Sequence, residues 1–167
     1  KKEIDAINLV IKNKKEPVTC IIGGSKISTK INVISNLIRE VNNLIIVGAM
    51  ANNFFLYKNF NIGKSLVEAN TKEIIEKIYE KAKINNCKII IPEDCVVSSS
   101  FEGEGKNKNL DQIENSEMIL DIGVNTIKKI EYIIDHTSTV LWNGPAGYFE
   151  NKNFLKGTMS IAENISK

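Results

Sequence analysis

Short apolar runs alternate with amphipathic stretches along most of the 167-residue chain. The first run, VTCII at residues 18–22, is continuous and rich in β-branched side chains, which predicts a strand buried on both faces. Later runs have the same character: LIIVG at 44–48, KIIIP at 88–92, MILDIG at 118–123, and TVLWNGPAG at 139–147, a strand followed by a turn. We therefore expect a series of short, mostly buried strands.

Between these runs, isoleucine and leucine recur at helical spacing. This periodicity predicts helices at residues 3–13, 28–42, 50–58, 71–85, 125–135 and 151–166. Thr71 is expected to cap the start of the fourth of these helices, and His136 the end of the fifth. The polar, glycine-containing segment 98–112 predicts a surface loop or a hairpin.

Strands that alternate with amphipathic helices are typical of an α/β fold. The length suits one hydrophobic core, and the composition, 43% hydrophobic and 25% charged, is that of an ordinary globular protein. We expect residues 1–167 to form a single domain, a Rossmann-like three-layer α/β/α sandwich with a mostly parallel sheet. Trp142 is expected to pack in its core.

Charge and cysteine content narrow the class of protein. The net charge is only +2, and the lysines are scattered among glutamates, so nucleic acid or a membrane surface is not an expected partner. No apolar run approaches the roughly 20 residues that a membrane span needs. Cys20, Cys87 and Cys95 lack metal-binding spacing, which predicts buried free thiols, no metal site and a cytoplasmic location.

Four of the predicted strands end in glycine-bearing turns. The glycines are Gly23 and Gly24, Gly48, Gly123, and Gly144 with Gly147. The carboxyl ends of parallel strands share one edge of a sheet, where such folds bind ligands, and glycine lets a ring or a phosphate approach the backbone. One such turn is ordinary, but four together favour a nucleotide site.

The common nucleotide motifs do not fit this site. A dinucleotide fingerprint needs G-x-G-x-x-G and an acidic residue after the second strand, whereas this chain has GGSKIS and a strand ending in Val47-Gly48. The GxxxxGK[ST] loop also fails, because only one residue separates the glycine pair from the lysine. A nucleotide-binding class outside these two remains, and a dehydrogenase domain is disfavoured.

Lys26 and Lys30 lie where the helix predicted at 28–42 begins. An exposed cation there opposes the helix dipole by about 0.3–1 kcal/mol, and the free N–H groups of that end attract anions. A phosphate would satisfy both lysines, and phosphoryl transfer needs such positive charge. The alternative is that both side chains point into water.

GGSKISTK, IIVGAMANNFF, IGKSLVEAN, LDIG and WNGPAGYFE occur in the order and with the approximate spacing of motifs in phosphoglycerate kinases. The chain thus resembles the C-terminal, nucleotide-binding lobe of that family along its whole length, with residues 1–15 matching the interdomain helix. The resemblance implies transfer of the acyl phosphate of 1,3-bisphosphoglycerate to Mg-ADP, giving ATP and 3-phosphoglycerate in glycolysis. It implies that Lys30 stabilises the transferring phosphoryl group and that Lys26 engages the same or neighbouring phosphates.

The resemblance also implies the nucleotide contacts. Gly24 and Ser25 match the turn against the nucleotide, and the walls of the adenine pocket match Gly48, Ala49 and Gly123. Asn143 and Pro145 match residues that contact the nucleotide near its phosphates and ribose. Glu150 matches the carboxylate that accepts hydrogen bonds from the ribose hydroxyls. Tyr148 stands where the family commonly has an aliphatic residue against the base, so affinity or base selectivity is expected to differ.

The family's GGGD[ST] segment, with the carboxylate for Mg²⁺, is expected beyond residue 167, and the phosphoglycerate-binding lobe lies outside this sequence. We therefore expect weak nucleotide binding and no turnover by these residues alone, since both phosphates must be held in line. The parent enzyme is expected to be monomeric. The alternative is a non-catalytic nucleotide-binding or regulatory module, although Lys26, Lys30 and Glu150 would then have no purpose.

Overall fold

The computed structural model describes residues 13–167, so the helix predicted at 3–13 lies almost wholly outside the described residues. Its centre is a four-stranded sheet in the order β3-β2-β1-β7. The strands are β1 (Val18–Ile22), β2 (Asn43–Ile46), β3 (Lys88–Ile90) and β7 (Thr139–Asn143). Every pairing in this sheet is parallel, as the continuous apolar runs predicted.

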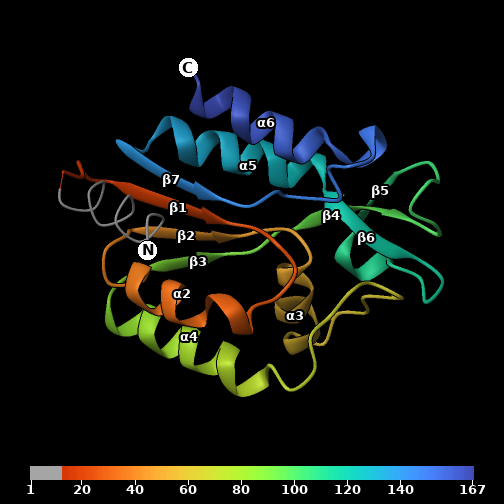
Figure 1. The fold of residues 1–167 in the computed structure, drawn as a ribbon, viewed down its shortest axis with the longest axis horizontal. Helices are drawn as coiled ribbons and strands as arrows, with labels where there is room; N and C mark the ends of the chain where they lie inside the picture. The colour runs from red at the N-terminus through yellow and green to blue at the C-terminus, as the bar shows by residue number, and fades with distance from the viewer. Residues whose placement is uncertain (1–12) are drawn as a thin grey trace.

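Helices cover both faces of this sheet (Figure 1). One side carries α2 (Ile31–Leu37) and α4 (Lys72–Ile84), and the other carries α5 (Val124–Asp135) and α6 (Lys156–Ile165). Neighbouring residues of a strand point to opposite faces. Accordingly, Cys20 and Ile22 pack in the core under α2 and α4, whereas Ile21 packs in the core under α5 and α6. The three-layer α/β architecture is confirmed.

A second sheet lies beyond one end of the first (Figure 1). It is antiparallel, in the order β5-β4-β6, with strands β4 (Asp94–Ser98), β5 (Lys106–Asn109) and β6 (Met118–Ile122). The segment predicted as a loop or hairpin therefore forms the turn and second strand of the β4–β5 hairpin. The run MILDIG forms β6 in this small sheet and not a strand of the parallel one, because an apolar run predicts burial but not the partner strand.

Helix boundaries differ from the predicted ones in places. The helix predicted at 28–42 is a 3₁₀ turn, η1 (Ser28–Lys30), followed by α2, which ends at Leu37. The helix α3 (Met50–Tyr57) agrees with prediction, while the stretch 151–166 divides into η3 (Lys152–Phe154) and α6. One further 3₁₀ turn, η2 (Leu110–Gln112), follows β5.

Several side chains test the sequence-based expectations. Thr71 precedes α4, but its hydroxyl donates to Asn53 and makes no cap hydrogen bond. His136 ends α5 as predicted, with its Nδ1 2.7 Å from the Tyr132 carbonyl oxygen. Trp142 is exposed, with its indole N–H donating to the Gly144 carbonyl, so the prediction of core packing is wrong. It lies near the end of β7, the last strand in the order β3-β2-β1-β7.

The three cysteines are free and buried, as predicted. Burial raises the pKa of the Cys20 and Cys95 thiols to about 12, so both remain protonated and unreactive. None of the helices in the described part of the chain is long and apolar enough to cross a membrane.

Candidate functional site

Three glycine-bearing turns meet at the carboxyl ends of β1, β2 and β7. The N–H of Gly23 donates to the Asn143 carbonyl at 2.8 Å, and the N–H of Gly48 donates to the Ala146 carbonyl at 3.0 Å. The Gly24 carbonyl in turn accepts from the N–H of Met50 at 2.8 Å, where α3 begins. Backbone hydrogen bonds thus join the turns into one continuous floor.

Close approach of the backbones explains why glycine occupies two of these positions. A Cβ atom at Gly23 would lie 2.0 Å from the Pro145 carbonyl oxygen, which is backbone and cannot move aside. Gly48 has a φ of +68°, and a Cβ atom there would lie 2.8 Å from the Gly24 nitrogen. The floor is therefore bare backbone, to which a flat ligand has access.

Gly123 does not belong to this floor, so the structure does not bring it together with the glycine turns after β1, β2 and β7. It follows β6 in the small sheet, and its N–H donates to the Asp94 carbonyl at 2.9 Å. A Cβ atom at Gly123 would lie 2.3 Å from the carboxyl carbon of Asp94, which explains the glycine by packing. The Asp94 carboxylate itself accepts from the N–H groups of Asn125 and Thr126, at the start of α5.

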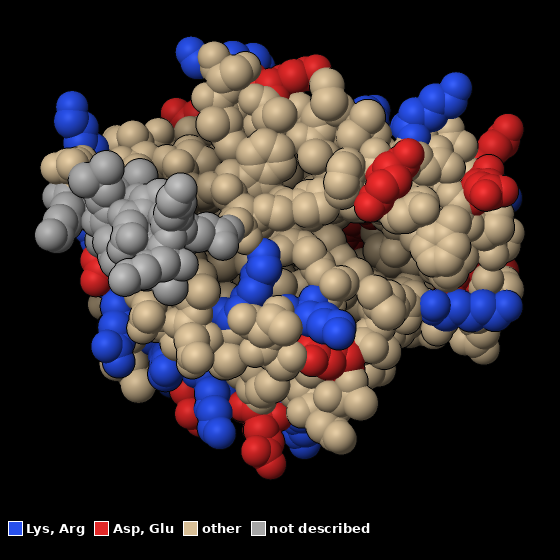
Figure 2. Space-filling model, viewed as in Figure 1, with Lys and Arg blue, Asp and Glu red and all other residues tan. Residues whose placement is uncertain are grey.

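A cavity of about 520 Å³ lies between the floor and the small sheet. Figure 2 shows a hollow in this face, with lysine or arginine side chains exposed beside it. The volume is in the range of sites for small molecules and cofactors. The predicted site residues that line the cavity are Gly24, Ser25, Gly48, Ala49, Pro145, Tyr148 and Glu150.

The cavity also has a wall that the sequence analysis missed. Its residues come from β6, from the loop after α3 and from the hairpin turn: Ile119, Leu120, Asp121, Lys64, Leu66 and Phe101. Ile119 of this wall lies four positions before Gly123, which does not line the cavity. The apolar character of β6 was visible in the sequence, but its position across from the glycine floor was not.

Lys26, Lys30 and Asn143 lie outside the cavity lining. The Lys30 ammonium donates to the Gly23 carbonyl at 3.1 Å and to the Asn143 side-chain oxygen, and it is only partly exposed. It therefore folds back over the carboxyl ends of β1 and β7, and the alternative in which both lysines point into water is wrong for Lys30. Lys26 is exposed.

Asp121 lies in the cavity wall but is almost fully buried. Its carboxylate accepts from the N–H of Gly157 at 2.8 Å and from its neighbour Ile122 at 2.9 Å. Burial raises the pKa of Asp121 to about 6, and the two N–H donors only partly oppose the rise. Asp121 thereby joins β6 to the first turn of α6.

Aromatic rings border the cavity. Tyr148 and Phe101 lie with ring centroids 5.1 Å apart and planes tilted by 57°, although 47 residues separate them along the chain. Asn151 supports this contact because its side chain donates to the Phe101 carbonyl at 2.8 Å. The site can therefore offer an aromatic surface to a planar ligand.

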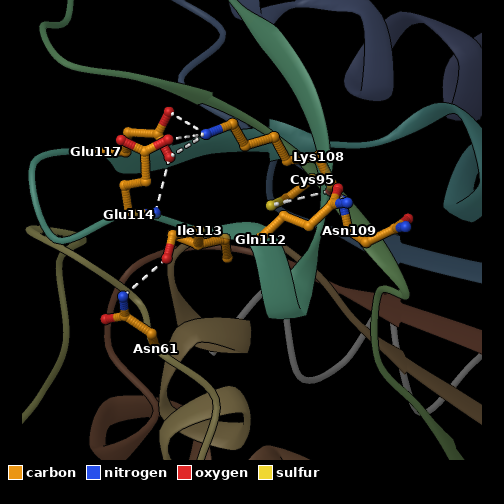
Figure 3. Close-up of polar contacts among 8 residues, drawn as sticks. All are labelled: Asn61, Cys95, Lys108, Asn109, Gln112, Ile113, Glu114 and Glu117. Atoms are coloured by element: carbon orange, nitrogen blue, oxygen red, sulfur yellow. Dashed lines mark hydrogen bonds and ion pairs between the residues drawn. The ribbon is translucent and has the colours of Figure 1, made fainter.

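Residues 61–71, named here the strap, cross from the small sheet to α3. At one end the Asn61 amide donates to the Ile113 carbonyl at 2.8 Å (Figure 3), and the Lys64 N–H donates to the Glu117 carbonyl at 2.7 Å. Glu117 is held in turn by the Lys108 ammonium, 2.8 Å from its carboxylate (Figure 3). The strap carries Lys64 and Leu66 of the cavity wall, so this ion pair fixes part of the site.

The fold and the cavity define an α/β protein with an open parallel sheet and a ligand cleft at its carboxyl edge. The sequence matches the phosphoglycerate kinase family over residues 1–167, and the chain belongs to that family. A phosphoglycerate kinase of Wolbachia pipientis wMel is 39% identical over 165 residues, 98% of this chain and 42% of the relative. One of Rhodopseudomonas palustris is 40% identical over 167 residues, 99% of this chain and 42% of the relative.

Solved structures agree. The structure of phosphoglycerate kinase from Coxiella burnetii matches with a TM-score of 0.92 at 34% identity, covering 99% of this chain and 44% of that one. The enzyme from Pyrococcus horikoshii OT3 matches with a TM-score of 0.78 at 27% identity, covering 99% of this chain and 43% of that one. The chain thus spans less than half the length of the relatives that it matches.

Proposed function

We propose that this chain is the nucleotide-binding lobe of a phosphoglycerate kinase, and that its cavity binds ADP and ATP. The observation that carries the proposal is the bare glycine floor at the carboxyl edge of the parallel sheet, closed by an apolar wall. A base would lie between floor and wall, in contact with Ala49 and Tyr148. Glu150, at the rim, would accept hydrogen bonds from the ribose hydroxyls.

The phosphates would then extend toward Lys30 and Lys26. In the proposed reaction, an oxygen of the terminal phosphate of ADP attacks the phosphorus of the acyl phosphate. The bond from phosphorus to the acyl oxygen breaks, and 3-phosphoglycerate leaves as a carboxylate. Negative charge spreads over the transferring oxygens, and the Lys30 ammonium, held by Gly23 and Asn143, would stabilise it.

The remaining requirements of the reaction concern groups outside the described residues. Within residues 13–167 no group of three or more acidic, histidine or cysteine side chains is placed to hold a metal ion. We assign neither a Mg²⁺ ligand nor the phosphoglycerate site to this chain. It follows that these residues alone should not complete the transfer, which we propose for a monomeric cytoplasmic parent enzyme.

Calorimetric titration of this chain with Mg-ADP, Mg-GDP and NAD tests the proposal. We expect both diphosphates to bind more tightly than NAD, because the glycine turns lack the G-x-G-x-x-G fingerprint and no acidic residue follows Val47-Gly48 at the end of the second strand. Tighter binding of NAD than of either diphosphate would refute the assignment. Formation of ATP from 1,3-bisphosphoglycerate and Mg-ADP by this chain alone would refute the proposal that these residues do not complete the transfer by themselves.

A further inference from the structure

We propose that Glu68 is a positioning residue for the phosphate-facing lysines, because it ties the turn that carries them to the strap along the nucleotide cavity. The inference rests on the proposed function, since Lys26 and Lys30 matter here as ligands of nucleotide phosphates. It adds a residue that lies outside the cavity lining and outside residues 26–30, named here the lysine turn.

The contact itself is specific. Glu68 accepts a hydrogen bond from the backbone N–H of Ser28 at 3.0 Å through one carboxylate oxygen, and from the Ser28 hydroxyl through the other. These hydrogen bonds hold the pKa of Glu68 below its ordinary value, and the nearby positive charge of Lys26 adds to the effect. The carboxylate therefore stays charged at neutral pH and accepts hydrogen bonds from two donors of Ser28 at once.

Ser28 stands midway between the two lysines. It begins η1, which ends at Lys30, and Lys26 lies two residues before it. Ile27 anchors this turn in the hydrophobic core, and the described hydrogen bonds of residues 26–29 to segments other than the helix that follows run to Glu68. A turn fixed at Ser28 holds the backbone that carries both lysines, which lowers the entropy lost when a phosphate binds.

The strap supplies a rigid anchor on the other side. The Glu68 N–H donates to the Asn53 side-chain oxygen at 3.0 Å, and the Asn52 side chain donates to the Leu66 carbonyl at 2.9 Å. Asn52 and Asn53 are both buried in α3, the helix that starts from the glycine floor. Glu68 thus connects α3 to the lysine turn, through Asn53 on one side and through Ser28, 40 positions earlier in the sequence, on the other.

Electrostatic competition alone predicts the opposite change in nucleotide affinity when the Glu68 carboxylate is removed, which makes the proposal testable. A carboxylate near Lys26 competes with phosphate, so loss of its charge should tighten nucleotide binding. Loss of a positioning contact should weaken binding of phosphate-bearing ligands and leave adenosine, which has no phosphate, unaffected. A purely structural role would weaken both ligands.

The test measures the affinities of the wild-type chain and of Glu68→Ala for Mg-ADP and for adenosine by calorimetry. We expect Glu68→Ala to weaken Mg-ADP binding by about fivefold to tenfold, and adenosine binding by less than about twofold. Glu68→Gln keeps an acceptor for Ser28 and should bind Mg-ADP within about twofold of the wild type. The matched control is Glu73→Ala, which removes another exposed carboxylate, in the first turn of α4, and should change neither affinity.

Four results would overturn the inference while the wild type binds Mg-ADP normally. They are unchanged or tighter Mg-ADP binding by Glu68→Ala, an equal loss of adenosine binding, a Gln variant as weak as the Ala variant, and an equal effect of Glu73→Ala. Failure of the wild type to bind Mg-ADP is a different outcome, because it refutes the proposed function and this inference with it.

Discussion

The buried carboxyl of Asp121 should make the stability of this chain fall as pH rises through the weakly acidic range. Its pKa is raised from 3.8 to about 6 in the folded protein, chiefly by burial. At pH values between these two pKa values, Asp121 is mostly protonated in the folded state and mostly deprotonated in the unfolded state. By linkage, the free energy of unfolding decreases with rising pH across this interval and is constant above it.

The expected magnitude follows from the two pKa values. A difference of about 2 in pKa corresponds to about 3 kcal/mol over the whole interval. Between about pH 4.5 and about pH 6.5, the loss attributable to Asp121 is about 2 kcal/mol, which lowers the Tm of a domain of this size by about 4–8 °C. Glu68 and Glu117 have lowered pKa values, so their contributions are lost below this window, as pH falls.

The assay is thermal or urea unfolding of the ligand-free chain at several pH values, for the wild type and for Asp121→Asn. Asparagine cannot ionise, and the hydrogen bond that it loses to Gly157 or Ile122 shifts stability equally at every pH in the series. The free energy of unfolding of the wild type, minus that of the variant, should therefore decline by about 2 kcal/mol from about pH 4.5 to about pH 6.5. A flat difference, or one that rises with pH, would refute the reasoning from burial.

In a full-length protein that carries this chain, Lys30→Ala should lower turnover by about 10²–10³-fold with a modest change in nucleotide affinity, because in the proposed mechanism its ammonium would act on charge that develops during transfer. Unchanged steady-state turnover would remove Lys30 from that mechanism. Gly23→Ala should lower the free energy of unfolding by about 2–4 kcal/mol, because the added methyl meets the Pro145 carbonyl at 2.0 Å, and urea unfolding with an unaltered midpoint would contradict this. Tyr148→Val should weaken adenosine binding by about threefold to tenfold through loss of the ring that contacts Phe101; calorimetry that finds equal affinity would place the base elsewhere.

Much of the architecture could be predicted because apolar periodicity reflects which faces are buried. The strand VTCII is buried at every position, and its two faces contact helices on opposite sides of the sheet. The glycine turns after β1, β2 and β7 were predictable for a related reason, since strands that are parallel neighbours must end at one edge. Local composition and simple geometry are sufficient for these features.

The small sheet could not be predicted in the same way. Strand β6 has the composition of a buried parallel strand, yet its partner is β4, in antiparallel register with an irregularity between Val96 and Val97. Pairing depends on contacts between distant segments, which no local pattern records. The place of Gly123 depends on this pairing, since a Cβ atom at that position would lie 2.3 Å from the carboxyl carbon of Asp94 in the neighbouring strand.

Long-range pairing also determines which negative charge the two lysines face. The sequence analysis expected a phosphate at the start of helix 28–42, and the ligand-free structure holds the Glu68 carboxylate there, against Ser28. The two charges are compatible. One carboxylate beside two ammonium groups leaves this corner with a positive balance, so a phosphate would still be attracted. A lysine turn without the carboxylate would be more positive but would lose its described hydrogen bonds to the strap, and the exposed Lys26 would need to be ordered by the nucleotide itself. Glu68 therefore reduces the attraction for phosphate somewhat and, in exchange, holds the turn that carries both lysines against the strap.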